Sequence, residues 1–213
     1  MPALPAPAPV QPQAQPAPLA APYSAAVAAR FPDPAVVYAT PGLRPGRTTF
    51  STNPEIQTWL RELAFATTGG NGPTARLLPL GKSQRNEPLE ALILLRGSAT
   101  DAEGVLAIGK PTVLLVGQQH GDEPAGAEAL LVLAKELAQG TLKPLLERIN
   151  VIIVPRANPD GAAAGQPTTA NGIDMGRDHL LLNTPEARAL AKLVRDYRPI
   201  VVVDAHEYGP LAP

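Results

Sequence analysis

The stretch Val113–Glu123, VLLVGQQHGDE, decides the fold class and carries the first sign of a functional site. Its opening residues are valine and leucine without interruption, as expected of a strand that is covered on both faces. The run stops at Gly117, and His120 and Glu123 follow it with a spacing of three. That spacing places the two side chains on neighbouring positions of one turn, close enough to share an ion. We therefore predict a buried strand that delivers two metal ligands.

A similar pattern occurs near the end of the chain, in Pro199–Tyr208, PIVVVDAHEY, where an apolar run leads into His206. In open α/β sheets, ligands bind beyond the carboxyl ends of the strands. Two histidines and one glutamate form a ligand set typical of catalytic zinc. We predict that His120, Glu123 and His206 converge on one divalent cation. The alternative for each histidine is a hydrogen-bonded loop residue, and for Glu123 it is a charge at a helix N-terminus.

Strand-like and helix-like segments alternate along most of the chain. Asn53 followed by Pro54 is typical of a helix cap with proline at the first helical position. The predicted strands are Ala75–Leu80, Glu90–Arg96, Thr112–Val116, Asn150–Val154 and Ile200–Val203, and the further predicted helices are Pro124–Gln139 and Thr184–Tyr197. This alternation predicts an α/β fold with a mostly parallel central sheet flanked by helices.

Composition narrows the classes of function. With 213 residues, 45% hydrophobic residues and a net charge of −1, the chain is typical of a globular protein without a basic field for nucleic acid. It contains no cysteine, so disulfides and thiolate ligands are excluded and any metal must be held by histidine and carboxylate. No apolar run approaches the roughly 20 residues that span a bilayer, so no membrane span is expected.

The N-terminal part differs from the rest in composition. Residues 1–40 are rich in proline and alanine, which predicts a disordered tail or linker, and residues 41–213 are predicted to form one domain. No signal peptide is visible, because prolines interrupt the apolar residues at the start. The composition of the tail nevertheless favours a periplasmic or secreted protein as an expectation.

Several segments together resemble a known family of enzymes. GQQHGDEPAG, VPRANPDG, NGIDMGRD, TPEARAL and VVVDAHEYG occur in an order and spacing similar to those of the zinc metallocarboxypeptidases related to carboxypeptidase A. The resemblance extends from about Leu77 to the last residue. It implies a zinc carboxypeptidase-like fold in which one zinc ion is bound by His120, Glu123 and His206.

The resemblance also implies roles for two further residues. Asp174 matches an aspartate that hydrogen-bonds a ligand histidine and thereby selects its tautomer. Arg177 matches the arginine that binds the free C-terminal carboxylate of a peptide substrate, a task suited to a planar donor fork.

The chain departs from the family pattern near these residues. Gly176 stands where the family usually has asparagine, and Pro167 and Thr168 stand where it usually has an arginine that polarises the scissile carbonyl. Loss of such a donor removes a contact of about 3 kcal/mol in the transition state. Arg156, at the end of a predicted strand, is our candidate for a substitute substrate-binding residue.

A larger departure concerns the general base. In this family a catalytic glutamate and a substrate-facing tyrosine come from segments well beyond the third zinc ligand, whereas this sequence ends at Pro213. Glu207 is a poor candidate for the base, because adjacent residues of a strand point to opposite faces. We therefore expect a catalytic domain that is incomplete at its C-terminus, with the general-base glutamate beyond Pro213 and no catalytic residue assigned here.

The predicted function is zinc-dependent hydrolysis of C-terminal peptide bonds by an activated water. One alternative is an amidase or deacylase of the same fold that acts on N-acyl amino acids. Another is a fragment that binds metal or peptide without catalysis. A ligand set of histidine and carboxylate also accepts other divalent ions, following the usual affinity order. The expected partner is a peptide or N-acyl amino acid substrate, and no oligomeric state is predicted.

Overall fold

The computed structural model describes residues 24–30, 38–67, 73–99 and 101–208. Its contacts divide the chain into two units, residues 1–37 and 38–213. The described part of the first unit contains a short helix, α1 (Ala25–Arg30), which the proline- and alanine-rich composition did not predict. The rest of the predicted tail falls almost entirely outside the described residues, and its boundary with the following domain stays a prediction.

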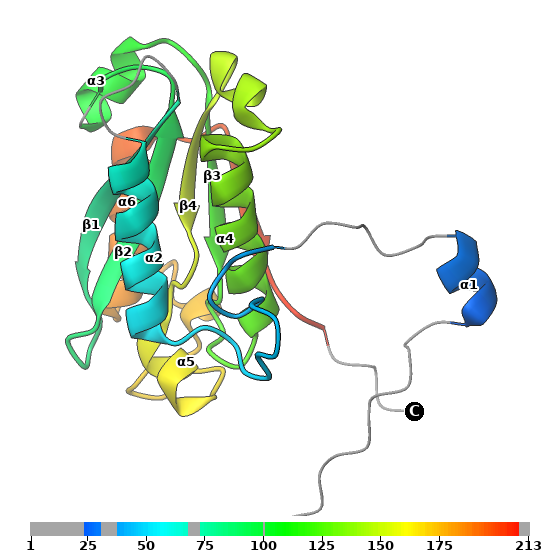
Figure 1. Ribbon diagram of the computed structural model, residues 1–213. Coiled ribbons are helices and arrows are strands. Elements are labelled where there is room, and N and C mark those ends of the chain that lie inside the picture. Colours follow the sequence, from blue (N-terminus) through cyan, green and yellow to red (C-terminus); the bar gives the residue numbers. More distant parts are fainter. Residues whose placement is uncertain (1–23, 31–37, 68–72, 100, 209–213) are drawn as a thin grey trace, which may run out of the picture. The chain divides into compact units, whose positions relative to one another are not determined.

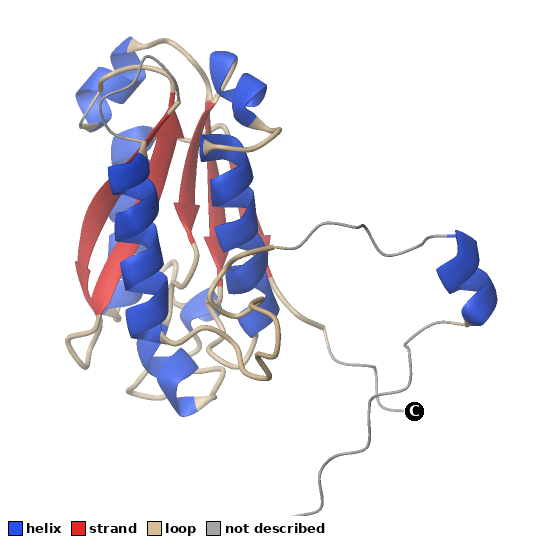
Figure 2. Cartoon of the chain, in the orientation of Figure 1, coloured by secondary structure: helices blue, strands red, loops and turns tan. Residues whose placement is uncertain are grey.

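The second unit is built on a mixed sheet of five strands in the order β1-β2-β4-β3-β5 (Figures 1 and 2). The strands are β1 (Thr74–Lys82), β2 (Pro88–Leu95), β3 (Thr112–Gly117), β4 (Asn150–Val154) and β5 (Val201–Ala205). β4, β3 and β5 run parallel, whereas β2 pairs antiparallel with both β1 and β4. The predicted α/β class is confirmed, and the parallel part of the sheet consists of the three strands nearest the predicted metal ligands.

Helices cover both faces of this sheet (Figure 1). They are α2 (Asn53–Ala66), α3 (Ala102–Ala107), α4 (Pro124–Ala138), α5 (Pro159–Ala164) and α6 (Pro185–Tyr197), with 3-10 turns at Lys143–Glu147 and Met175–Arg177. Val151 and Ile153 of β4 pack with α2 and α4 on one face, and Ile152 and Val154 pack with α6 on the other. This alternation explains why β4 is apolar from Val151 to Val154. No described helix combines the length and apolarity that crossing a bilayer requires.

β5 is the edge strand of the described sheet and remains open on one side. It pairs with β3, and its residues Val201, Val202 and Val203 are 45%, 51% and 46% exposed. An apolar edge strand offers unpaired backbone groups and side chains to any passing strand. Within the described residues, one side of β5, the strand that leads to the third predicted ligand, is therefore uncovered.

Two buried carboxylates hold the polar connection between β1 and β2 by hydrogen bonds. Asp160, 2% exposed, accepts hydrogen bonds from the Ser83 hydroxyl at 2.8 Å and the Arg85 backbone N–H at 2.9 Å. Glu186, 1% exposed, accepts one from the Gln84 backbone N–H at 3.1 Å. Burial raises the pKa of Glu186. These carboxylates lie in the first turns of α5 and α6, where the helix dipole favours negative charge.

The N-terminus of α2 is fixed by an ion pair. Thr52, rather than the predicted Asn53, is the cap residue, and its backbone N–H donates to Glu55 Oε2 at 2.8 Å. Arg47 donates to both oxygens of Glu55, at 2.7 and 2.9 Å. The hydrogen bond from Arg47, together with those from Thr52, lowers the pKa of Glu55 from 4.5 to about 2. Asn53 is free to make contacts elsewhere because Thr52 and Glu55 complete the cap.

The Glu55→Gln variant is expected to lose less free energy of unfolding than the wild type as the pH falls. Because the pKa of Glu55 is lowered on folding, its contribution is fully present above pH 4.5 and is lost as the pH falls toward about 2. Urea unfolding from neutral pH down to about pH 2 should show the variant less stable near neutrality and converging with the wild type in acid. Glu62→Gln, an exposed position on the same helix, is the matched control. If the free energy of unfolding of Glu55→Gln fell with pH as steeply as that of the wild type, Glu55 would not have the lowered pKa.

Candidate metal centre

The loops after β3 and β5 are brought together by the parallel pairing of these strands. Gly117, the last residue of β3, is the register partner of Ala205, the last residue of β5. The loop that carries His120 and Glu123 therefore starts beside the residue that precedes His206. This pairing explains how ligands so far apart in the sequence reach one place.

Glu123 lies between the two histidines. Its Oε1 is 2.8 Å from His120 Nδ1, and its Oε2 is 2.8 Å from His206 Nδ1. One candidate ligand atom from each of the three residues lies within 4.8 Å of the others. The imidazole rings are tilted by 53° with centroids 4.8 Å apart. The structure thus brings together the three residues predicted as ligands, and binding of a metal by them stays a prediction.

The outer nitrogen of each imidazole faces a second carboxylate. His120 Nε2 is 3.2 Å from Asp174 Oδ1, and His206 Nε2 is 2.9 Å from Asp204 Oδ2. Asp174 was expected at this place from the family resemblance. Asp204 was not assigned, although its position two residues before His206 at a strand end puts both side chains on one side.

The charges of the cluster stabilise one another. Burial lowers the pKa of His120, but its hydrogen bonds with Glu123 and Asp174 outweigh this and raise the pKa overall. The pKa of His206 is raised in the same way by Asp204 and Glu123 against the effect of burial. Burial acts to raise the pKa of Glu123, but its hydrogen bonds lower it overall. Glu123 is therefore kept as a carboxylate.

Glu123 also occupies the start of α4, where it is the cap residue. Its Oε2 accepts a further hydrogen bond from the Glu207 backbone N–H at 3.0 Å. The Glu207 carboxylate turns toward the same helix and accepts from the Ala125 backbone N–H at 2.6 Å. Both carboxylates benefit from the positive end of the helix dipole.

The loop between β3 and α4 is tightly constrained. A Cβ at Gly121 would overlap the backbone of Gly161 and Ala162, so only glycine fits there. Gln118 has a φ of 51°, in the left-handed region that non-glycine residues seldom adopt. Its side chain donates to the Gly121 carbonyl at 2.8 Å. The conformation that presents His120 and Glu123 is thus held by the loop's own side chains.

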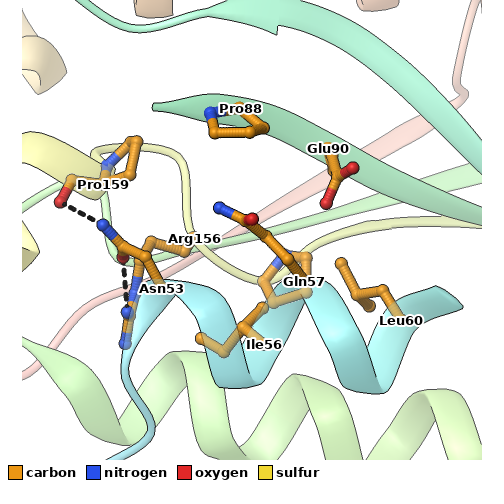
Figure 3. A pocket seen from close by; sticks show the side chains of 9 residues that line it. Asn53, Ile56, Gln57, Leu60, Pro88, Glu90, Arg156 and Pro159 are labelled. Atoms are coloured by element: carbon orange, nitrogen blue, oxygen red, sulfur yellow. Dashed lines mark hydrogen bonds between the residues drawn. The ribbon is translucent and has the colours of Figure 1, made fainter. Parts of the chain in front are cut away.

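Arg156 lies behind this loop and is 9% exposed. Its guanidinium donates to Gln118 Oε1 at 2.6 Å, Asn53 Oδ1 at 2.7 Å and the Ser51 carbonyl at 2.7 Å. Figure 3 shows Asn53 between Arg156 and Pro159, whose carbonyl accepts from Asn53 at 3.0 Å. Burial lowers the pKa of Arg156 to about 10. The structure places Arg156 in an internal network rather than among the groups that contact the cluster, and its substrate-binding role stays a prediction.

Arg177 follows Gly176, a residue that lies near His120. It ends a 3-10 turn that begins after Asp174, and it is exposed. Within the described residues its guanidinium has no hydrogen-bond partner or ion pair. The preceding Gly176 is so close to the site that a Cβ there would lie 3.7 Å from His120 Nε2. The substrate-binding role of Arg177 stays a prediction.

Arg156→Lys is expected to lower the free energy of unfolding by about 2 kcal/mol, since each buried polar partner left unpaired costs about 1–3 kcal/mol. A single ammonium cannot reproduce the donor fork that reaches three acceptors. Urea denaturation measures the effect, with Arg195→Lys at an exposed position as the control. Unchanged stability would favour the substrate-binding role over the network.

Comparison with known proteins agrees with this geometry. A family model described as zinc carboxypeptidase matches residues 58–181. Carboxypeptidase 2 of Trichophyton rubrum is 39% identical over 101 residues, which make up 46% of this chain and 19% of the fungal protein. The chain thus spans about a fifth of the length of that relative.

Solved structures show the same fold. The metallo-carboxypeptidase from Burkholderia cenocepacia superposes with a TM-score of 0.61 and 21% identity over 74% of this chain and 41% of that one. The carboxypeptidase A from Helicoverpa armigera has a TM-score of 0.63 and 19% identity over 76% of this chain and 46% of that one. The fold predicted from the resemblance is confirmed. The family model covers more than half of the 213 residues of this chain, and the chain therefore belongs to the zinc carboxypeptidase family.

Proposed function

We propose that the chain is the zinc-binding portion of a metallocarboxypeptidase that hydrolyses C-terminal peptide bonds. The observation that carries the proposal is the convergence of His120 Nδ1 and His206 Nδ1 on the two oxygens of Glu123. Membership of the zinc carboxypeptidase family supports the same conclusion.

The donor set fits zinc. Catalytic zinc is usually held by three protein ligands drawn from histidine and carboxylate, which leaves a coordination position for water or substrate. The nitrogens that face Glu123 are both Nδ1, while both Nε2 atoms face carboxylates that suit an outer supporting role. Each histidine thus directs its Nδ1 toward Glu123, while its Nε2 is hydrogen-bonded to a second carboxylate. Other divalent ions compete for such a set by the usual order of affinity.

Bound zinc supplies a water of lowered pKa and polarises the carbonyl of the scissile bond. The residues of this chain orient the groups around that chemistry. Asp174 and Asp204 accept from the Nε2–H of the two imidazoles, so each Nδ1 would be left to bind the metal in place of its hydrogen bond with Glu123. Arg177 supplies a cation for the terminal carboxylate of a peptide.

The proton acceptor of the reaction is assigned to a segment beyond Pro213 in the whole protein. Among the described carboxylates around the cluster, Asp174, Asp204 and Glu207 each have a hydrogen-bond partner. Glu207 in particular is committed to the N-terminus of α4. We therefore expect the 213-residue chain to bind zinc without turning over peptide.

Two other functions remain as alternatives of the same site. An amidase or deacylase would use the same metal ligands on N-acyl amino acids, and Gly176 and Pro167 favour it because they remove side-chain donors expected for a peptide. A binding module without catalysis would need the ligands alone. Export to the periplasm or the cell exterior is a further proposal, supported by the composition of residues 1–40.

The chain is expected to bind one equivalent of zinc, and Glu123→Gln should weaken binding by about a hundredfold or more. Loss of a supporting residue already costs about 10–100-fold in metal affinity, so loss of a ligand should exceed that range. Isothermal titration of the metal-free chain provides the measurement, and Glu62→Gln is the control. Equal affinity in Glu123→Gln and the wild type would remove the basis of the proposal.

The substrate class is tested by binding to the zinc-loaded chain. A peptide with a free C-terminal carboxylate should bind more tightly than the same peptide ending in an amide, and Arg177→Met should abolish the difference. An N-acyl amino acid that competes with the free peptide at lower concentration would favour the deacylase alternative.

A further inference from the structure

A line of hydrogen bonds leads from the candidate ligand His206 to a third histidine on another loop. His206 Nε2 is 2.9 Å from Asp204 Oδ2, and the same oxygen is 2.5 Å from Gln119 Nε2. Gln119 Oε1 is 2.9 Å from His179 Nε2. The line joins the end of β5, the end of β3 and the loop before α6. The zinc ligand set does not include Gln119 or His179.

The chemistry of the four groups determines the direction of every hydrogen bond. The Asp204 carboxylate only accepts, so Gln119 must face it with its amide N–H and His206 must face it with Nε2–H. The oxygen of the Gln119 amide then faces His179, which must donate from Nε2. A neutral His206 that carries its proton on Nε2 has its lone pair on Nδ1, the atom that faces Glu123. When a bound metal takes the place of the hydrogen bond between Nδ1 and Glu123, the line favours the tautomer whose Nδ1 lone pair can hold that metal.

Gln119 is well placed to transmit such an effect. It is 3% exposed, and its backbone carbonyl accepts from Asn158 Nδ2 at 3.1 Å, so it has little freedom to turn. Gln119, His179 and Asp204 also line a cavity of about 460 Å³ whose other walls are mostly aliphatic, including Leu114 and Val202. Gln119 is the buried member of the line, so leaving its amide unpaired is costly.

We propose that Gln119 and His179 are positioning residues, which hold Asp204 against His206 and keep the Nδ1 of His206 directed at the metal site. Gln119 acts on Asp204 directly, and His179 acts through Gln119 by orienting its amide. The inference rests on the proposed metal site and adds two residues to it. Asp174, on the opposite side, supports His120 without such a line among the described residues.

Cobalt(II) binding to the 213-residue chain tests the proposal, because its visible absorption reports the ligand geometry as well as the affinity. Gln119→Met, which keeps volume but removes the donor, should weaken cobalt binding about tenfold and alter the absorption bands. His179→Ala should weaken binding in the same direction, and His179→Gln, which keeps an N–H donor, should restore it. The exposed Gln139→Met is the matched control for the glutamine substitution.

A variant with both substitutions shows whether His179 acts through Gln119 or independently of it. If His179 acts only through Gln119, then Gln119→Met with His179→Ala should bind cobalt no more weakly than Gln119→Met alone. Losses that add, or wild-type affinity and absorption in Gln119→Met, would overturn the inference and leave the metal site standing. Failure of the wild-type chain to bind cobalt would overturn the metal site and this inference together.

Circular dichroism establishes that each variant is folded. His179 is exposed, so its two single variants decide the question even if Gln119→Met does not fold. Weaker binding in His179→Ala without recovery in His179→Gln would then count against the line.

Discussion

The carboxylate of Glu123 is the group on which the site depends. Each of its oxygens faces the Nδ1 of one histidine, and it also accepts the backbone N–H of Glu207. It is the cap residue at the N-terminus of α4, so the helix dipole favours its charge. A single side chain thus joins the loop after β3, the end of β5 and the start of a helix. Geometry at the site follows from the packing of all three.

Around that carboxylate the protein keeps polar groups in fixed orientations. Arg156 holds Gln118 from behind the loop, and Asn158 holds the backbone of Gln119. Such buried networks cost desolvation energy, and they are tolerable because their members are paired. The result is a fixed geometry of the candidate ligands, because side chains supported by a second layer of contacts keep their orientation. The strained backbone at Gln118 is consistent with this demand.

Much of the fold was predictable because its signals are local. Strands β3 and β4 are covered on both faces and consist of unbroken apolar runs, and α4 and α6 begin with proline after a capping position. The short helices α3 and α5 were missed because their six residues include glycine and give too little periodicity. The cap of α2 was placed one residue late, at Asn53, because Thr52 and Asn53 are both good cap residues and only the ion pair of Glu55 decides between them.

The sequence by itself determined the kinds of ligand available, their places just beyond apolar strands, and the family to which those segments belong. Only the tertiary structure decided which other side chains serve them. Asp204 and Gln119 meet across 85 positions of chain, and Arg156 reaches Asn53 across 103. Such pairings depend on strand register and on the path of loops, and no local pattern of residues encodes them. Hydrogen-bond partners of this kind are selected by distance and direction in space, so they become visible once the strands are in register.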